Sequence, residues 1–133
     1  MPIYPRPDQI KALLGSDFSG PVSMLNLLRF RPLAKYEDGR ETSLTGRDAY
    51  ALYAEQMTPY VASHGGRLIH SSQARFLMIG DGELEWDSVA IVEYPSKEAF
   101  ARIASAPEVA RFAIHRTAGL AHQLLVACST GVV

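Results

Sequence analysis

Two segments of this chain that have the composition of β-strands are apolar on both of their faces. In the first, Val89 and Ile91 share one face while Ala90 and Val92 share the other, because successive side chains of a strand point to opposite sides. The segment 120–127 has the same property. A sheet built from such strands has to be covered on both sides, since a large exposed apolar face would be an association surface.

The order of the expected elements narrows the fold further. After a short helix at about residues 8–14, the hydrophobic pattern predicts the order β-α-β-β-α-β. The expected strands are 22–30, 67–79, 86–94 and 120–127, with a helical region after the first strand and another after the third.

This order is that of the split βαβ arrangement, which has two crossovers around one central hairpin. Right-handed crossovers then place both helical regions on one face of a four-stranded antiparallel sheet. We therefore predict an α+β protein with a ferredoxin-like fold, in a single domain over residues 1–133. Its core is expected at about 22–127, and 130–133 are expected to form a frayed end.

Residues that favour helix ends support these boundaries. Asp8 is the expected N-cap of the short helix, and Gly15 its stop,. Thr45 and Ser96 are the expected N-caps of the two helical regions that follow. Pro107 is expected at the first position of a further helix, where its missing N–H costs nothing.

Helices can cover only one face of this sheet, so another surface has to cover the second face. The simplest cover is the same face of an identical chain, in a symmetric dimer. If the protein forms a homodimer, polar side chains within the strands become buried and need partners.

Composition excludes several classes of partner. The chain has 13 basic and 14 acidic residues, a net charge of −1 and no block of like charge. A nucleic-acid or membrane surface therefore has no electrostatic support. Cys128 is the only cysteine, which favours a reducing compartment. With no secretory signal and no membrane-spanning run expected, the protein is predicted to be cytoplasmic.

Polar residues interrupt the apolar strands at four positions, which are Asn26, Glu93, His122 and Gln123. Each group has to bond to another side chain, bond to the backbone or line a pocket. A structural role is the simpler explanation for any one of them alone. Taken together, they favour a wet cavity.

Aromatic residues near the strand ends admit two interpretations. Trp86 and Asp87 could flank a ligand, or they could form a rim and a turn. Tyr50 and Tyr53 fit a helical core stripe, and their hydroxyls could reach the surface or the edge of a cavity.

The histidines do not form a metal pattern. None of the four lies at H-x-H or H-E-x-x-H spacing, so a metal ion is not expected. No cofactor is predicted, although a single histidine could hold a haem. His115 and Arg116 could complement a helix dipole. A neutral His115 could instead act as a general base. Phosphate-binding, dinucleotide-binding and serine-nucleophile motifs are absent from the sequence.

Short motifs spread along the chain resemble those of one known family. They occupy residues 26–31, 46–50, 65–66, 86–87, 93–96, 99–100 and 115–118, with Tyr53 in addition. In order and spacing they resemble the domain of unknown function 1330, a family of the dimeric α/β barrel superfamily, from about residue 22 to 125. The sequence departs from the pattern at Val109, where an aromatic residue is common, and at Gly119, where Ala is common.

The resemblance implies a ferredoxin-like fold and a barrel formed by two subunits. It implies no activity, because the family has none assigned. Related barrel families include cofactor-free monooxygenases, lactone isomerases and haem-dependent enzymes, but this analogy concerns the fold alone.

Two functional hypotheses follow. The first is a cofactor-free enzyme, similar to a monooxygenase or an isomerase, that acts on a small carboxylated or aromatic metabolite. Its ligand-binding residues would be Asn26, Arg29, Tyr50, Tyr53, Trp86 and Arg116. The residues that move a proton would be His115, Glu93 and Asp87. The second hypothesis is a non-catalytic ligand-binding or assembly module, and the presence of a solvent-filled pocket would separate the two.

Overall fold

The centre of the sheet is β1 (Val22–Phe30), whose bounds agree with those expected from the sequence. In the computed structural model, which describes residues 3–130, β1 pairs with β3 (Ser88–Tyr94) and β4 (Leu120–Ser129). The strand β2 (Arg67–Gln73) pairs with the far side of β3, which gives the order β2-β3-β1-β4 with every pair antiparallel. The α+β class and the predicted topology are confirmed. The end at 131–133 lies outside the described residues.

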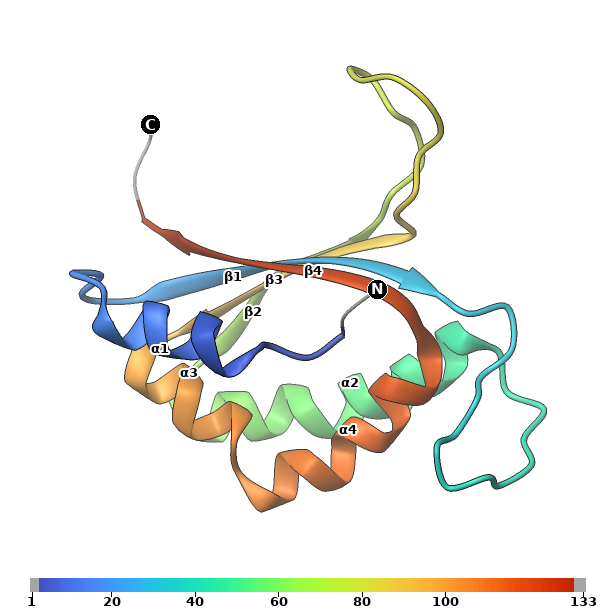
Figure 1. Cartoon of the computed structure of the whole chain (residues 1–133), viewed down its shortest axis with the longest axis horizontal. Helices are drawn as coiled ribbons and strands as arrows, with labels where there is room; N and C mark the ends of the chain where they lie inside the picture. Colours follow the sequence, from blue (N-terminus) through green and yellow to red (C-terminus); the bar gives the residue numbers. More distant parts are fainter. Residues whose placement is uncertain (1–2, 131–133) are drawn as a thin grey trace.

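All the helices of the described part lie on one side of this sheet (Figure 1). They are α1 (Pro7–Gly15), α2 (Gly46–Ser63), α3 (Lys97–Ala104) and α4 (Pro107–Gly119). The core lies between the sheet and the helices, where Val22, Met24 and Leu28 of β1 are almost completely buried. These residues alternate with half-buried Leu25 and Leu27, so the second set faces away from the helices.

Helix capping follows the sequence closely, with one exception. The Thr45 hydroxyl accepts the Asp48 N–H at 3.1 Å, and the Ser96 hydroxyl accepts the Ala99 N–H at 3.0 Å. Both N-cap predictions are confirmed. The N-cap prediction for Asp8 is wrong, because α1 begins one residue earlier at a proline and Asp8 lies within its first turn.

The predicted strand 67–79 is too long, because β2 ends at Gln73. Residues 74–87 form a long loop that rises on the side of the sheet away from the helices (Figure 1). Phe76, Met78 and Ile79 within it are 81%, 85% and 93% exposed. Their apolar character predicted a strand, but no neighbouring strand pairs with them in the described structure.

The face of the sheet opposite the helices, which we call the outer face, carries apolar side chains from three strands. Leu25 pairs with Val126 and Ile91, and Leu27 pairs with Leu124 and Val89. Leu124 and Val126 are both 45% exposed. In the described chain no helix covers this face, so the second cover that the two-faced apolar pattern requires does not come from these helices.

Candidate functional site

A cavity of about 370 Å³ lies between the sheet and the helices. We call it the main cavity. Its floor comes from the helix-facing side chains of the strands, and its opposite wall comes from α2 and α4. The lining includes Met24, Asn26, Tyr50, Tyr53, Met57, Arg116 and Gln123.

A second cavity of about 370 Å³ adjoins the first beside α1, and we call it the side cavity. Residues Tyr4, Pro5, Arg116 and Gln123 line both cavities. The two cavities therefore adjoin beside Tyr4 and Pro5, in the segment that precedes α1.

Two amide side chains form a hydrogen-bonded relay on the floor of the main cavity. The Asn26 Nδ2 group donates to the carbonyl oxygens of Met24 and Ala90, at 3.2 and 3.3 Å. This orientation leaves Asn26 Oδ1 as an acceptor, and Gln123 Nε2 donates to it at 2.9 Å. Gln123 Oε1 is then directed elsewhere, and it is buried with no hydrogen-bond partner in the described structure.

Tyr50 and Tyr53 bring aromatic surface and two hydroxyls to the cavity. They lie one helical turn apart on α2, with ring centroids separated by 5.4 Å. Burial raises the pKa of both phenols, an effect that the nearby positive charge of Arg116 only partly opposes. Both hydroxyls are therefore protonated near neutral pH and can donate hydrogen bonds.

Arg116 is the only charged residue among the described residues that line the main cavity. Its guanidinium donates a hydrogen bond to the Ile3 carbonyl and lies 5.2 Å from the centre of the Tyr4 ring. Neither interaction neutralises its charge, so the cavity carries a positive charge that a ligand anion could balance.

Asn26, Tyr50, Tyr53 and Arg116 are thus brought together around one cavity. Gln123, which the sequence marked as an interruption of an apolar strand, lies with them. The other residues singled out from the sequence lie elsewhere.

Glu93 and Asp87 do not line the main cavity. Glu93 pairs with Arg67 of the neighbouring strand at 3.1 Å. The Asp87 carboxylate accepts the Phe30 N–H at 2.8 Å, and the Asp87 N–H donates to Leu28. Asp87 therefore holds the end of the long loop against β1, which is a structural contact.

Arg29 and Trp86 lie near the same end of the long loop. The Arg29 guanidinium donates to the Glu85 carbonyl at 3.0 Å, while Trp86 is half-buried. His122 pairs with Arg29 across β1 and β4, and its Nδ1 is buried without a partner in the described structure. None of the three lines the main cavity.

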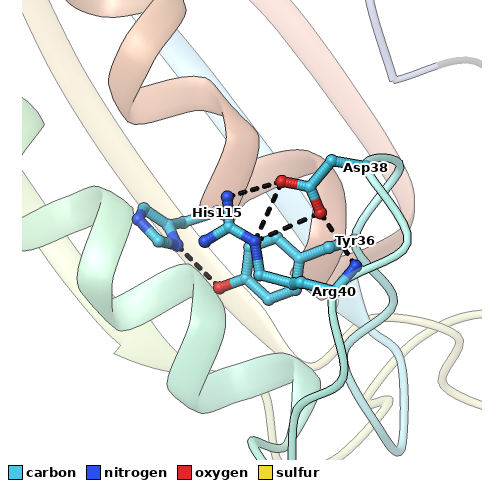
Figure 2. Close-up of polar contacts among 4 residues, drawn as sticks. All are labelled: Tyr36, Asp38, Arg40 and His115. Atoms are coloured by element: carbon cyan, nitrogen blue, oxygen red, sulfur yellow. Dashed lines mark hydrogen bonds and ion pairs between the residues drawn. The ribbon is translucent and has the colours of Figure 1, made fainter.

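His115 belongs to a separate polar cluster, which Figure 2 shows. Its Nδ1 shares a hydrogen bond of 2.6 Å with the hydroxyl of Tyr36, a residue only 6% exposed. Arg40 lies over the Tyr36 ring at 4.5 Å and forms an ion pair of 2.6 Å with Asp38. Burial, followed by the positive charge of Arg40, lowers the pKa of His115. The cluster ties the loop after β1 to α4, and His115 does not line the main cavity.

Sequence reasoning did not identify Tyr4, Tyr36 or Thr117 as interacting residues. The Tyr4 hydroxyl lies 2.5 Å from the Thr117 hydroxyl, although 113 positions separate them in the chain. No local pattern marks such a contact. Tyr36 lies in a loop whose polar composition predicts no packing.

The described residues contain neither a cluster of metal-binding side chains nor a membrane-spanning helix. Within residues 3–130, no three His, Cys, Asp or Glu side chains lie close enough together to hold a metal ion. No helix in that part of the chain has the length and apolar character needed to cross a bilayer.

The topology defines an α+β protein with a ferredoxin-like fold. Residues 40–129 match the model of DUF1330, the domain of unknown function 1330. The chain therefore belongs to the DUF1330 family, which confirms the resemblance seen in the motifs. The motif at 26–31 lies outside the matched residues.

Solved structures agree with this assignment. The RPA0582 protein of unknown function from Rhodopseudomonas palustris is 32% identical, with a TM-score of 0.87 and coverage of 98% of both chains. A crystal structure of methylated RPA0582 is 35% identical, with a TM-score of 0.89 and coverage of 98% of this chain and 96% of that one. No curated protein matches the chain.

More distant structures share the fold alone. A dabb family protein with a ferredoxin-like fold from Mesorhizobium loti is 11% identical, with a TM-score of 0.53. It matches 85% of this chain and 99% of its own length. The At3g17210 protein from Arabidopsis thaliana is 17% identical, with a TM-score of 0.56 and coverage of 84% and 97%.

Proposed function

We propose that the main cavity binds a small, mostly apolar or aromatic molecule that carries one negative charge. The observation that carries this proposal is Arg116, the one charged residue among the described lining residues. The cavity volume lies in the range of about 300–1,000 Å³ that is typical of small-molecule sites. Tyr50 and Tyr53 supply aromatic surface and hydrogen-bond donors beside the charge.

The lining supports binding better than catalysis. A cofactor-free reaction of the monooxygenase or isomerase kind needs a group that takes up a proton near neutral pH. The raised phenol pKa values exclude Tyr50 and Tyr53 from that role, and His115, Glu93 and Asp87 do not line the cavity. Binding without chemistry is therefore our first choice, and no organic cofactor or metal is part of it.

We further propose that two copies of the chain pair through their outer faces. Its centre is apolar, with Leu124 and Val126 about half exposed, and such faces are typical of protein interfaces. We place the protein in the cytoplasm, where a lone cysteine such as Cys128 stays reduced,.

Thermal-shift screening against a library of metabolic carboxylates and their neutral analogues tests the binding proposal. A ligand at 100 times its Kd adds about 2.7 kcal/mol to the free energy of unfolding. Hits should be anionic and should disappear in Arg116→Gln. The matched control is Arg111→Gln on the exposed side of the same helix, which should keep them. Hits that survive Arg116→Gln would contradict the proposal.

Light scattering at micromolar concentration tests the pairing. We expect a dimer for the native chain and a monomer for Val126→Glu, which places a charge in the centre of the outer face. Leu33→Glu is the control, because Leu33 is 64% exposed and lies outside the sheet. A native chain that stays monomeric would show that the outer face has another cover.

A further inference from the structure

Residues 3–5 are held against the site by polar contacts more than by packing. Tyr4 is 52% exposed, so burial alone does not fix its position. Instead, the Ile3 carbonyl accepts a hydrogen bond from Arg116, and the Tyr4 hydroxyl lies 2.5 Å from that of Thr117. These hydrogen bonds hold the segment beside both cavities. A ligand with suitable groups can replace them.

The groups that the segment presents form a recognisable chemical pattern. A carbonyl oxygen lies on the guanidinium of Arg116, an aromatic ring lies 5.2 Å from the same group, and a phenolic hydroxyl reaches Thr117. Thr117 is 6% exposed, and among the described residues the Tyr4 phenol is the partner of its hydroxyl. Residues 3–5 therefore give an oxygen acceptor and a ring to Arg116 of the cavity wall, and a hydroxyl to the adjacent Thr117.

Gln123 places a further polar side chain in the wall that the two cavities share. Its Oε1 is buried without a partner in the described structure, and the residue lines both cavities. The relay through Asn26 prevents the amide from turning, since a flip would bring two carbonyl oxygens together,. An unsatisfied buried acceptor is costly, so this part of the shared wall is not fully satisfied by the contacts within the described chain.

We infer that residues 3–5 act as an internal substitute for the ligand, and that the ligand is a small aromatic carboxylate bearing a hydroxyl group. Its carboxylate takes the place of the Ile3 carbonyl on Arg116, and its hydroxyl takes the place of the Tyr4 hydroxyl. Each end of the ligand thus replaces a contact that residues 3–5 otherwise make with α4. This inference rests on the proposed function and specifies the ligand class of the same site.

The exchange favours an anion over a neutral ligand. A carboxylate accepts two parallel hydrogen bonds from a guanidinium, and such charge-assisted bonds are about twice as strong as those to a neutral carbonyl. A neutral amide of the same shape gains no such advantage over Ile3. Because the segment must first leave, the apparent affinity is reduced by the fraction of molecules in which the site is open.

Calorimetric titration with four named probes tests the inference. They are 3-hydroxybenzoate, 4-hydroxybenzoate, benzoate and 4-hydroxybenzamide. At least one hydroxybenzoate should bind the native chain more tightly than benzoate or the amide. Tyr4→Ala should bind that hydroxybenzoate about tenfold more tightly, since it removes the competitor. Arg116→Gln should bind it at least about tenfold more weakly.

Thr117→Val separates the hydroxyl contact from the carboxylate contact. This variant should lose the preference for hydroxybenzoate over benzoate while still binding benzoate. Leu33→Ala, in the exposed loop after β1, is the control and should match the native chain with every probe.

Weaker or unchanged binding in Tyr4→Ala would overturn the inference, because Tyr4 would then be part of the wall. Failure of every hydroxybenzoate to bind Tyr4→Ala would overturn it as well. In either case the proposed function survives if other anions from the metabolite library bind in a way that requires Arg116. If no compound does so, both fail.

Discussion

Gly46 and Gly119 meet backbone to backbone, where α2 begins and α4 ends. A Cβ atom on Gly46 would lie 2.6 Å from the carbonyl oxygen of Gly119, closer than real Cβ contacts. The Gly46 N–H also donates to the Arg31 carbonyl, and the Arg31 N–H donates to the Gly119 carbonyl. The close approach sets the spacing of the two helices that carry Tyr50 and Arg116 into the main cavity.

Replacing Gly46 by alanine should therefore destabilise the protein. The added methyl group meets backbone atoms of Arg31 and Gly119, which cannot rotate away. We expect a loss of about 1–3 kcal/mol in the free energy of unfolding, measured by urea denaturation. The control is Gly15→Ala at the end of α1, where a Cβ meets open space. An equal loss in both variants would show that the close approach is not the cause.

Replacing Asn26 by aspartate should be costly at neutral pH. The Asn26 amide donates to two backbone carbonyls, and a carboxylate there would face both of them without a proton. We expect a loss of at least about 2 kcal/mol in the free energy of unfolding. The loss should shrink at pH 4, where protonation restores a donor. Gln73→Glu at the exposed end of β2 makes the same change in solvent and should be nearly neutral.

His115 should make stability depend on pH in a defined direction. Its pKa in the folded state lies below the ordinary value of 6.5, so folding favours the neutral imidazole. The contribution of His115 is constant well above pH 6.5 and is lost as the pH falls below it. We expect the difference in unfolding free energy between pH 8 and pH 5 to be smaller in His115→Asn than in the native chain. An NMR titration in which His115 has a pKa above 6.5 would contradict this sign.

Removing the charge of Glu93 should leave ligand binding intact. Glu93 pairs with Arg67 outside the cavity, and such an exposed pair contributes about 0–1 kcal/mol to stability. Glu93→Gln should change the affinity for any library hit by less than about twofold, since a tenfold change requires 1.4 kcal/mol. Calorimetry on this variant beside Arg116→Gln checks the difference. A large loss of affinity in Glu93→Gln would show that Glu93 contributes to ligand binding.

Local signals in the sequence predicted those parts of the fold that depend on local interactions. Thr45 and Ser96 cap helices through bonds to residues three positions away. The segment 74–79 was assigned wrongly because an apolar run with strand composition still needs a partner strand, which sequence periodicity does not supply.

The residues of the candidate site also include some that local patterns predicted and others that they did not. Asn26 and Gln123 stood out as polar residues inside apolar strands, and both line the main cavity. Glu93 stood out for the same reason, but alternation along β3 places it on the outer face with Ile91,. The contact between Tyr4 and Thr117 joins distant parts of the chain, so it becomes visible only after folding.

The central position of β1 has a consequence for how the protein is made. Val22 pairs with Ser129, 107 positions further along the chain, and also with Tyr94, 72 positions further along. During synthesis β1 can pair with β3, but it cannot pair with β4 until residues 120–129 leave the ribosome. Pairings this distant in sequence form slowly, so β1 and its apolar side chains stay open until late. During that interval the exposed apolar side chains of β1 are a surface to which a chaperone can bind.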